Sequence, residues 1–220
     1  MSTRTKRDTM PIPKRSPRVQ RVMAWALGRS EAGMAKTYGT AKAALLAELR
    51  GDIVEIGPGT GANLPYYAEG VRVIGIEPNR YMAPYLTKKA KAQGIHFELA
   101  PGHAENLPLE DASADAVVST LVLCSVFDLD RVLAEAHRVL RPGGRFVFLE
   151  HVAAPRGSWT RRFQHWVKPV WRYLGDGCCP DREIERHIEQ AGFACLEIEH
   201  RYIHAGLPLI GRHIAGKATR

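Results

Sequence analysis

Five short apolar runs recur along the chain, and amphipathic helical patterns accompany them. The runs hold few polar residues, which is typical of strands that are covered on both faces of a parallel sheet. They occupy residues 53–56, 71–76, 95–99, 116–119 and 145–149. The helical patterns occupy residues 62–68, 81–93, 129–140 and 181–191. This alternation predicts an α/β protein with a doubly wound sheet, because right-handed crossovers place helices on both faces.

The two ends of the chain follow other patterns. Residues 19–27 and 41–49 predict two helices ahead of the first strand. The first of them either covers an active site, rests on a membrane surface or simply packs on the sheet. Near the C-terminus, residues 194–202 and 214–218 predict an antiparallel hairpin. We therefore expect one domain over residues 22–220, with a Rossmann-like sheet that is mostly parallel and ends in that hairpin.

Glycines at alternate positions follow the first predicted strand. Gly57, Gly59 and Gly61 form a turn in which the backbone can adopt positive φ and approach a ligand closely. A helix that begins near Ala62 would direct its free N–H groups at this turn, as in nucleotide sites. A dinucleotide fingerprint has the spacing G-x-G-x-x-G, whereas here the third glycine comes one residue early. Glu55 adds a carboxylate at the end of the strand.

A second carboxylate, Glu77, ends the second predicted strand, about 20 residues after the glycine turn. A carboxylate at this place can accept hydrogen bonds from both hydroxyls of a ribose. The segments 101–108 and 120–125 also leave the predicted sheet at the carboxyl ends of strands. Ligands of doubly wound sheets bind at that edge. The common position of these segments therefore predicts a single ligand site.

The pattern E-x-G-x-G-x-G at residues 55–61 resembles motif I of class I S-adenosyl-L-methionine (SAM) methyltransferases. The resemblance implies SAM as the cofactor, with the glycines facing its methionine and ribose parts. In that family an acidic residue of the loop after the third strand receives the adenine amino group. His103 stands in its place here, so Glu105 or backbone groups are left to make that contact. The candidate cofactor-binding residues are Glu55, Gly57, Pro58, Gly59, Gly61, Asn63, Glu77, Pro78, His103, Ala104, Glu105, Thr120, Leu121 and Cys124.

Residues 152–180 interrupt the alternation of strands and helices. Aromatic and basic side chains are interleaved in this insertion, which holds three of the four tryptophans of the chain. An inserted amphipathic segment with aromatic faces can form an apolar pocket and exclude water. We therefore expect it to be a lid over the substrate. The alternative is an additional packing helix that does not contact the substrate.

Further motifs extend the resemblance beyond the superfamily. T-L-V-L-C-S-V at residues 120–126 and G-D-G-C-C at residues 175–179 resemble the methyltransferase-like 7 family. Its members are membrane- and lipid-droplet-associated thiol methyltransferases, and the chain looks like a bacterial relative. The resemblance implies in-line transfer of a methyl group to a small lipophilic thiol. Two alternatives stay open: N- or C-methylation of a phospholipid amine or a quinone-type ring, and a SAM-binding module without catalysis.

Two residues beside the predicted lid are candidates for catalysis. A thiol reacts as its thiolate, so a base near the methyl group would assist the transfer. His151 follows a strand that ends at the site, and imidazole titrates near neutral pH. The alternative for His151 is a hydrogen-bonded hinge of the lid. Asp176 is the second candidate, as the partner that orients a histidine. We expect no metal site, because the adjacent Cys178 and Cys179 do not form a zinc knuckle.

The positive charge of the chain is concentrated at its start. The formal net charge is +8, and residues 1–21 hold seven basic residues against one acidic residue. With three prolines among them, these residues predict a flexible basic tail. Such a tail either contacts an anionic membrane peripherally or is simply solvated. Aromatic residues do not alternate with its charges, so we expect no nucleic-acid partner.

The compartment follows from what the sequence holds and lacks. No apolar run approaches the roughly 20 residues that span a bilayer, and the start shows no secretory signal. The animal members of the family begin with a hydrophobic anchor, whereas this chain begins with the basic tail. The four cysteines have no C-x-x-C spacing, which favours reduced thiols. We therefore expect a cytoplasmic protein with at most peripheral membrane contact; the pattern leaves the oligomeric state open.

Overall fold

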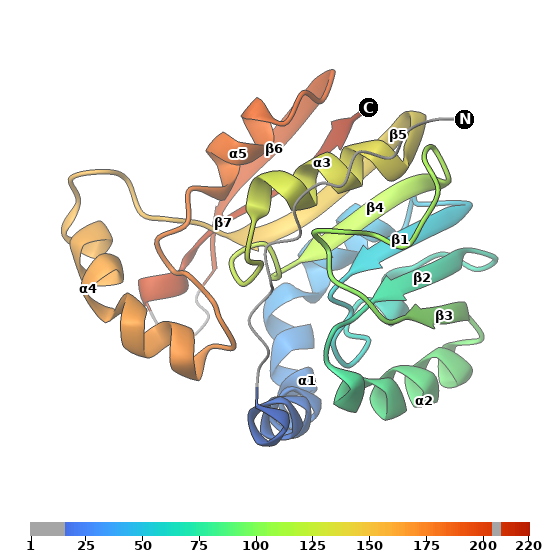
Figure 1. Ribbon diagram of the computed structural model, residues 1–220, viewed down its shortest axis with the longest axis horizontal. Coiled ribbons are helices and arrows are strands. Elements are labelled where there is room, and N and C mark those ends of the chain that lie inside the picture. Colours follow the sequence, from blue (N-terminus) through green and yellow to red (C-terminus); the bar gives the residue numbers. More distant parts are fainter. Residues whose placement is uncertain (1–15, 204–207) are drawn as a thin grey trace.

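The computed structural model describes residues 16–203 and 208–220, which fold around a seven-stranded sheet (Figure 1). The strands are β1 (Asp52–Ile56), β2 (Arg72–Ile76), β3 (His96–Ala100), β4 (Ala114–Thr120), β5 (Leu140–His151), β6 (Cys195–Tyr202) and β7 (Arg212–Thr219). Their order in the sheet is β3-β2-β1-β4-β5-β7-β6. The first five pair in parallel, and β7 is antiparallel to both β5 and β6. The predicted fold class and C-terminal hairpin are confirmed.

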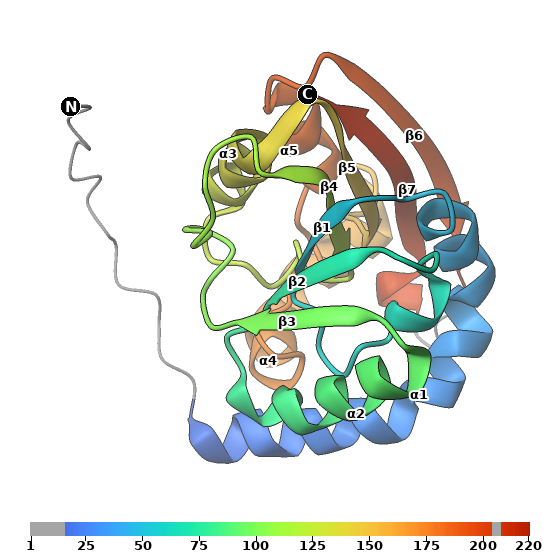
Figure 2. The ribbon, with the colours of Figure 1, turned by 90° about the vertical axis from the view of Figure 1, so that its right-hand side faces the viewer.

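Helices cover both faces of this sheet (Figure 2). They are α1 (Pro17–Leu46), α2 (Ala83–Gln93), α3 (Leu129–Val139), α4 (Trp159–Leu174) and α5 (Ile184–Gln190). Three 3-10 turns, η1 (Leu64–Tyr66), η2 (Arg80–Met82) and η3 (Pro208–Ile210), complete the described elements. None of the helices among the described residues is both long and apolar enough to cross a membrane.

The alternation of side chains along the strands divides the core into two layers. Val54 and Ile56 of β1 belong to the layer that contains the buried residues of α3 and α5. Ile53 of β1 belongs to the opposite layer, with residues of α1 and α2. Phe146 and Phe148 of β5 are fully buried in the first layer. Because both faces bury apolar residues, the strands read as continuous apolar runs in the sequence.

The two predicted N-terminal helices are in fact one continuous helix, α1. The predicted tail is also shorter than expected, because α1 begins within it. Residues 17–21 belong to α1, and residues 1–15 of the tail lie outside the described part of the chain. Gly28 and Gly39 lie within the helix where neighbouring rings approach. A Cβ at Gly28 would meet Tyr85 at 2.7 Å, and one at Gly39 would meet Tyr66 at 2.8 Å. These glycines serve close packing rather than helix termination.

Two further expectations are corrected at element boundaries. The helix predicted for residues 62–68 is absent; turns and the 3-10 segment η1 occupy that stretch, and Pro65 lies within η1. Proline has no N–H to donate, so it does not support a helix interior here. The strand β5 starts at Leu140, and residues 141–144 bulge between the pairs that Leu140 and Arg145 form with β4.

The order of the strands places a crevice between β1 and β4. The chain passes from β1 to β2 and β3 on one side, and then returns to β4 on the other side of β1. Two loops therefore diverge at the carboxyl ends of β1 and β4, where ligands of doubly wound sheets bind. The helices α1 and α4 lie at this end of the sheet (Figure 1).

Candidate active site

A cavity of about 910 Å³ opens at the carboxyl ends of β1, β2 and β4. Residues of α1, α4 and the loop after α4 complete its wall. Its volume lies near the upper end of the roughly 300–1,000 Å³ that small-molecule sites span. Most of the predicted site residues line it: Glu55, Gly57, Pro58, Gly59, Asn63, Glu77, Pro78, His103, Ala104, Glu105, Thr120, Leu121 and Asp176.

The glycine turn after β1 has the backbone that only glycine adopts readily. Gly57 and Gly59 have φ of +60° and +56°, in the left-handed region. A Cβ at Gly57 would lie 2.8 Å from the side chain of Val122, so the loop after β4 packs directly on this glycine. A Cβ at Gly59 would meet nothing within 4 Å, and Gly59 lines the cavity. The turn thus leaves open space beside its backbone, as a cofactor cradle requires.

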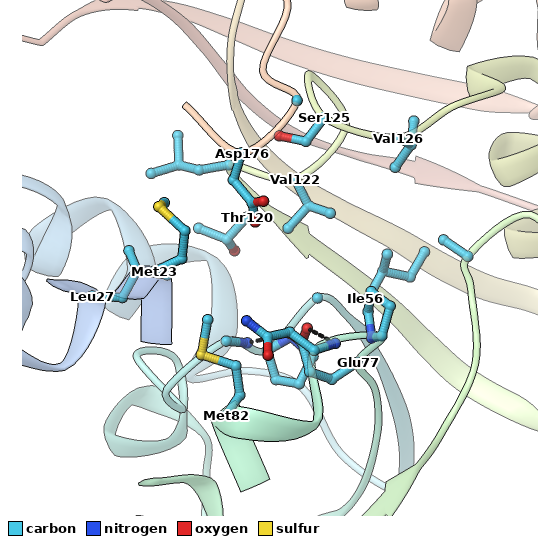
Figure 3. A pocket seen from close by; sticks show the side chains of 18 of the residues that line it. Met23, Leu27, Ile56, Glu77, Met82, Thr120, Val122, Ser125, Val126 and Asp176 are labelled. Carbon is cyan, nitrogen blue, oxygen red and sulfur yellow. Dashed lines mark hydrogen bonds between the residues drawn. The ribbon is translucent and has the colours of Figure 1, made fainter. Parts of the chain in front are cut away.

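Glu77 holds the next stretch of the cavity wall in place (Figure 3). Its Oε2 accepts a hydrogen bond from the Gly59 N–H at 3.0 Å, and its Oε1 accepts one from the Asn79 N–H at 2.8 Å. The Asn79 side chain in turn donates to the carbonyl of Gln20 in α1. Each carboxylate oxygen can accept a further hydrogen bond. The arrangement therefore suits the two hydroxyls of a ribose.

Glu55 is the centre of a buried polar network under the glycine turn. It accepts hydrogen bonds from Asn63 Nδ2 at 2.8 Å and from the Tyr67 hydroxyl at 2.9 Å. Asn63 Nδ2 also donates to Thr120 Oγ1 at 3.0 Å, which ties the turn to the end of β4. Burial raises the pKa of Glu55 to about 7. Burial also lowers the pKa of Lys42, a neighbour in α1, to about 8.

A second buried carboxylate, Glu150, shapes the loop after β4. It accepts hydrogen bonds from Ser119 Oγ at 2.7 Å and from the N–H groups of Val122 and Leu123 at 3.2 Å each. Burial raises the pKa of Glu150 to about 7. Leu121, within this loop, has a φ of +58°, which is strained for a leucine. The loop thus depends on Glu150 to present its residues to the cavity.

The loop after β3 contributes the side of the cavity where the family resemblance implies contact with adenine. His103, Ala104 and Glu105 line the wall there. Glu105 Oε1 accepts hydrogen bonds from the N–H groups of Phe127 at 2.7 Å and Asp128 at 3.4 Å. The carboxylate therefore fastens this loop to the segment before α3. Its contact with adenine stays a prediction.

Three predicted site residues do not line the cavity. Gly61 has φ +82°, and a Cβ there would meet Leu64 at 2.9 Å, so it serves packing behind the turn. Cys124 is buried below the loop after β4, with 2% of its surface exposed. His151 is 5% exposed, and its Nε2 lies 3.1 Å from Cys178 Sγ. These three residues lie at the carboxyl edge of the sheet, but they are not part of the cavity wall.

The opposite end of the cavity is formed by helices and by the loop after α4. Met23 and Leu27 of α1 point into it, and Asp176 lies beside Thr120 at this end, away from Glu77 (Figure 3). Asp176 has a φ of +52°, a conformation that is uncommon for non-glycine residues, although aspartate adopts it more readily than most. The basic side chains that reach this part of the wall are Lys168, Arg172 and Arg182.

Comparisons with known proteins identify the family to which a chain with this site belongs. Residues 54–148 match the family model of a methyltransferase domain. The chain is 43% identical over 173 residues to human thiol S-methyltransferase TMT1B, covering 76% of this chain and 70% of that protein. Human thiol S-methyltransferase TMT1A is 41% identical over 171 residues, with the same shares covered. The chain belongs to the thiol S-methyltransferase family. It is a SAM-dependent methyltransferase of class I, as the motifs at residues 55–61 and 175–179 predict.

A solved structure shares the fold of this methyltransferase. A SAM-dependent methyltransferase of Thermotoga maritima, described as a possible histamine N-methyltransferase, superposes with a TM-score of 0.67. The two chains are 25% identical, and the match covers 93% of this methyltransferase and 99% of the other. The space beside Gly59 and the carboxylate of Glu77 fit the cofactor SAM, which carries a ribose and a methionine chain.

Some residues of this methyltransferase site give little signal in the sequence. Lys42 lies in an alanine- and leucine-rich stretch and reads as an exposed helix position, yet only 3% of it is exposed. Tyr67 follows a turn and reads as a core aromatic. Glu150 directly follows the predicted strand at residues 145–149. A charged residue inside an otherwise apolar strand is the signal that would have identified Glu150, since an ion is buried only with partners.

Proposed function

We propose that this methyltransferase transfers the methyl group of SAM to the sulfur of a small lipophilic thiol. The observation that carries the proposal is the division of the cavity. One end offers the glycine turn and Glu77, and the other offers apolar residues together with the carboxylate of Asp176. The human relatives are thiol S-methyltransferases by name, which supports sulfur as the methyl acceptor.

The cofactor end would hold SAM by backbone and carboxylate contacts. Bound SAM supplies a methyl group on a positively charged sulfonium. Glu77 would accept hydrogen bonds from the ribose hydroxyls, and the backbone of Gly57 and Gly59 would lie against the cofactor. Glu55 and the network around it fix the turn that carries these contacts. Close and collinear placement of two reactants can contribute up to roughly 7–11 kcal/mol to a displacement.

The acceptor end suits an apolar molecule that ionises to a thiolate. Met23, Leu27 and Met34 of α1 supply apolar surface there. A thiol has a pKa of about 8.5 in water, and nearby cations lower it. Lys168 and Arg172 of α4 line the same part of the cavity and provide such cations.

Asp176 is the residue that we propose to accept the proton of the acceptor thiol. Of the two catalytic candidates, it alone lines the cavity. It lies on the loop after α4, next to Thr120 from the end of β4 (Figure 3). His151 lies outside the wall and contacts Cys178 instead, so direct proton transfer from the acceptor to His151 has no support in this geometry.

We also propose that the insertion at residues 152–180 acts as a lid that rests on an anionic lipid surface. Five large apolar residues of α4 are 51–82% exposed and recur every three or four positions along one face: Trp159, Phe163, Trp166, Val170 and Tyr173. The helix contains four Lys or Arg residues and no acidic residue. Aromatic and basic side chains together are typical of helices that lie in a membrane interface. A lipophilic thiol would then enter the cavity from the lipid.

The compartment expected from the sequence fits this proposal. The four cysteines lie within the described residues and are all free, which supports a reducing, cytoplasmic environment. Contact with the membrane would then be peripheral, through α4 and the basic tail.

Product analysis with isotopically labelled SAM tests the acceptor. The purified protein is incubated with a panel of alkyl and aryl thiols, a phosphatidylethanolamine and a demethylated quinone, and the products are identified by mass spectrometry. We expect S-methylated thiols, with turnover that increases with the apolarity of the thiol. Methylation of the amine or of the quinone ring would replace the thiol proposal with the corresponding alternative. Binding of SAM by calorimetry without transfer to any acceptor class would also overturn it.

A further inference from the structure

Two cysteines and a histidine from three distant segments meet outside the cavity wall. Cys124 comes from the loop after β4, His151 is the last residue of β5, and Cys178 follows α4. All three are buried, with 2%, 5% and 8% of their surface exposed. One ligand atom of each lies within 4.8 Å of those of the other two. The proposed methyl transfer uses none of these groups.

We propose that Cys124, His151 and Cys178 bind a zinc ion. Thiolate and imidazole are the ligands that zinc prefers, with bonds of about 2.3 Å to sulfur and 2.0–2.1 Å to nitrogen. Tetrahedral coordination would then separate the ligand atoms by about 3.4–3.8 Å. His151 Nε2 already lies 3.1 Å from Cys178 Sγ. The three atoms thus need shifts of only about 1 Å, which side-chain rotations supply.

The surroundings of the cluster suit a bound ion. Two thiolates balance the charge of a divalent cation, so the site adds no net charge to the buried region, where an unbalanced charge is costly. Trp171 Nε1 donates a hydrogen bond to Cys178 Sγ at 3.2 Å. N–H groups that donate to a coordinated sulfur stabilise the thiolate and orient it. The indole N–H is therefore already placed to hydrogen-bond to a metal-bound sulfur without binding the metal itself.

The sequence concealed this site because its ligands are far apart. The neighbouring Cys178 and Cys179 have no zinc-ligand spacing, and this led to the expectation of no metal. The fold brings Cys124 beside Cys178, and the Cys179 N–H donates to the Cys124 carbonyl at 2.9 Å. Cys179 itself does not belong to the cluster, and its sulfur lies 3.7 Å from the Gly177 carbonyl. It is thus a matched control of equal chemistry.

A zinc ion here would join two parts of the cavity wall. Ser125 from the loop after β4 lines the cavity next to Cys124 in the chain, and Gly177 and Cys179 line it on either side of Cys178. The ion would fix the loop after α4 on the loop after β4. Three protein ligands leave the fourth position of a tetrahedral ion for water or another small ligand. This inference does not depend on which acceptor is methylated.

Metal titration of the full chain tests the site. Protein prepared free of metal is titrated with Co²⁺, and absorption is followed in the near ultraviolet, where thiolate-to-cobalt charge transfer appears. We expect one Co²⁺ per chain with this absorption, displacement by Zn²⁺, and a rise in melting temperature with Zn²⁺. Cys178→Ser and His151→Gln should each weaken binding at least a hundredfold, while Cys179→Ser and Cys195→Ser should bind within threefold of the natural chain.

The result with the natural chain decides the matter even if a variant fails to fold. Absence of Co²⁺ and Zn²⁺ binding by the natural chain would overturn the proposal. Binding that survives Cys178→Ser unchanged would overturn it too, as would a Cys124–Cys178 disulfide in place of metal when the protein is purified aerobically. Binding of SAM by each variant, measured by calorimetry, reports that the variant has folded.

Discussion

The two ends of the cavity are formed by different kinds of structural element. The cofactor end consists of backbone and side chains at the ends of β1, β2 and β4, where strand pairing fixes the points from which the loops leave the sheet. The acceptor end consists of long side chains on α1, α4 and the loop after α4. A site on strand ends presents the same groups whatever the acceptor, whereas a site on helices and loops can change with it. The first end thus specifies the cofactor and the second specifies the substrate.

Removal of the Glu77 carboxylate tests this division most severely. Glu77→Ala removes the acceptor for the Gly59 and Asn79 N–H groups, together with the proposed ribose contacts. Hydrogen bonds to a charged group contribute about 1.5–3 kcal/mol each, so the loss of two weakens SAM at least a hundredfold. Calorimetry with SAM measures this change. The matched change at the acceptor end, Asp176→Asn, should leave SAM affinity within about threefold; equal losses in both variants would refute the division.

The sequence predicted the cofactor end because its signals are local. Gly57 and Gly59 require positive φ, and Glu77 follows a strand, so each position is set by residues close to it in the chain. Lys42 and Met23 reach the cavity only because α1 continues unbroken from Pro17 to Leu46. The glycines within α1 concealed that continuity, since glycine is the poorest helix former after proline.

The direction of its side chain explains why His151 does not line the cavity, although its position in the sequence predicts that it would. The sheet places it at the ligand edge, as expected, but neighbouring residues of a strand point to opposite faces. Its ring packs with Cys178 and lies 6.3 Å from the ring of His213 in β7. Which face a residue takes at the last position of a strand depends on the following loop, and the insertion after β5 has no pattern that predicts it.

Substitution of Asp176 probes the acceptor end alone. If this carboxylate accepts the thiol proton, Asp176→Asn lowers kcat/KM for the thiol by about tenfold to a hundredfold at pH 7, where only a few per cent of a thiol is ionised. The loss should shrink to about twofold near pH 9.5, above the thiol pKa of about 8.5. A pH profile of initial rates measures both values. A defect that is constant across this range would show that Asp176 positions the acceptor without taking its proton.

The exposed face of α4 offers a test of how the acceptor arrives. Trp159→Ser, Trp166→Ser and Tyr173→Ser together remove three aromatic side chains from that face. We expect about tenfold weaker sedimentation with phosphatidylglycerol vesicles, and unchanged turnover of a water-soluble thiol, because the substituted side chains lie outside the cavity. Tyr202→Ser removes an aromatic residue that is 56% exposed on β6 and serves as the control. Unchanged sedimentation of the triple variant would exclude α4 as the lipid contact.

Glu150 belongs to neither end of the cavity, since it supports the loop that both ends share. Its substitution should have the smallest effect of the four changes considered. Burial raises its pKa from 4.5 to about 7, so the folded state favours the protonated form. The stabilisation is complete below pH 4.5 and disappears as pH rises through 7. Glu150→Gln cannot titrate, and its free energy of unfolding should therefore fall less steeply between pH 5 and 7 than that of the natural chain. The difference in slope should be about 1 kcal/mol per pH unit, measured by urea unfolding.

Glu98→Gln removes the same charge from an exposed position of β3 and should leave the slope unchanged. If Glu150→Gln and the natural chain gave parallel curves, the carboxylate would be ionised in both states, and the three hydrogen bonds from Ser119, Val122 and Leu123 would outweigh its burial.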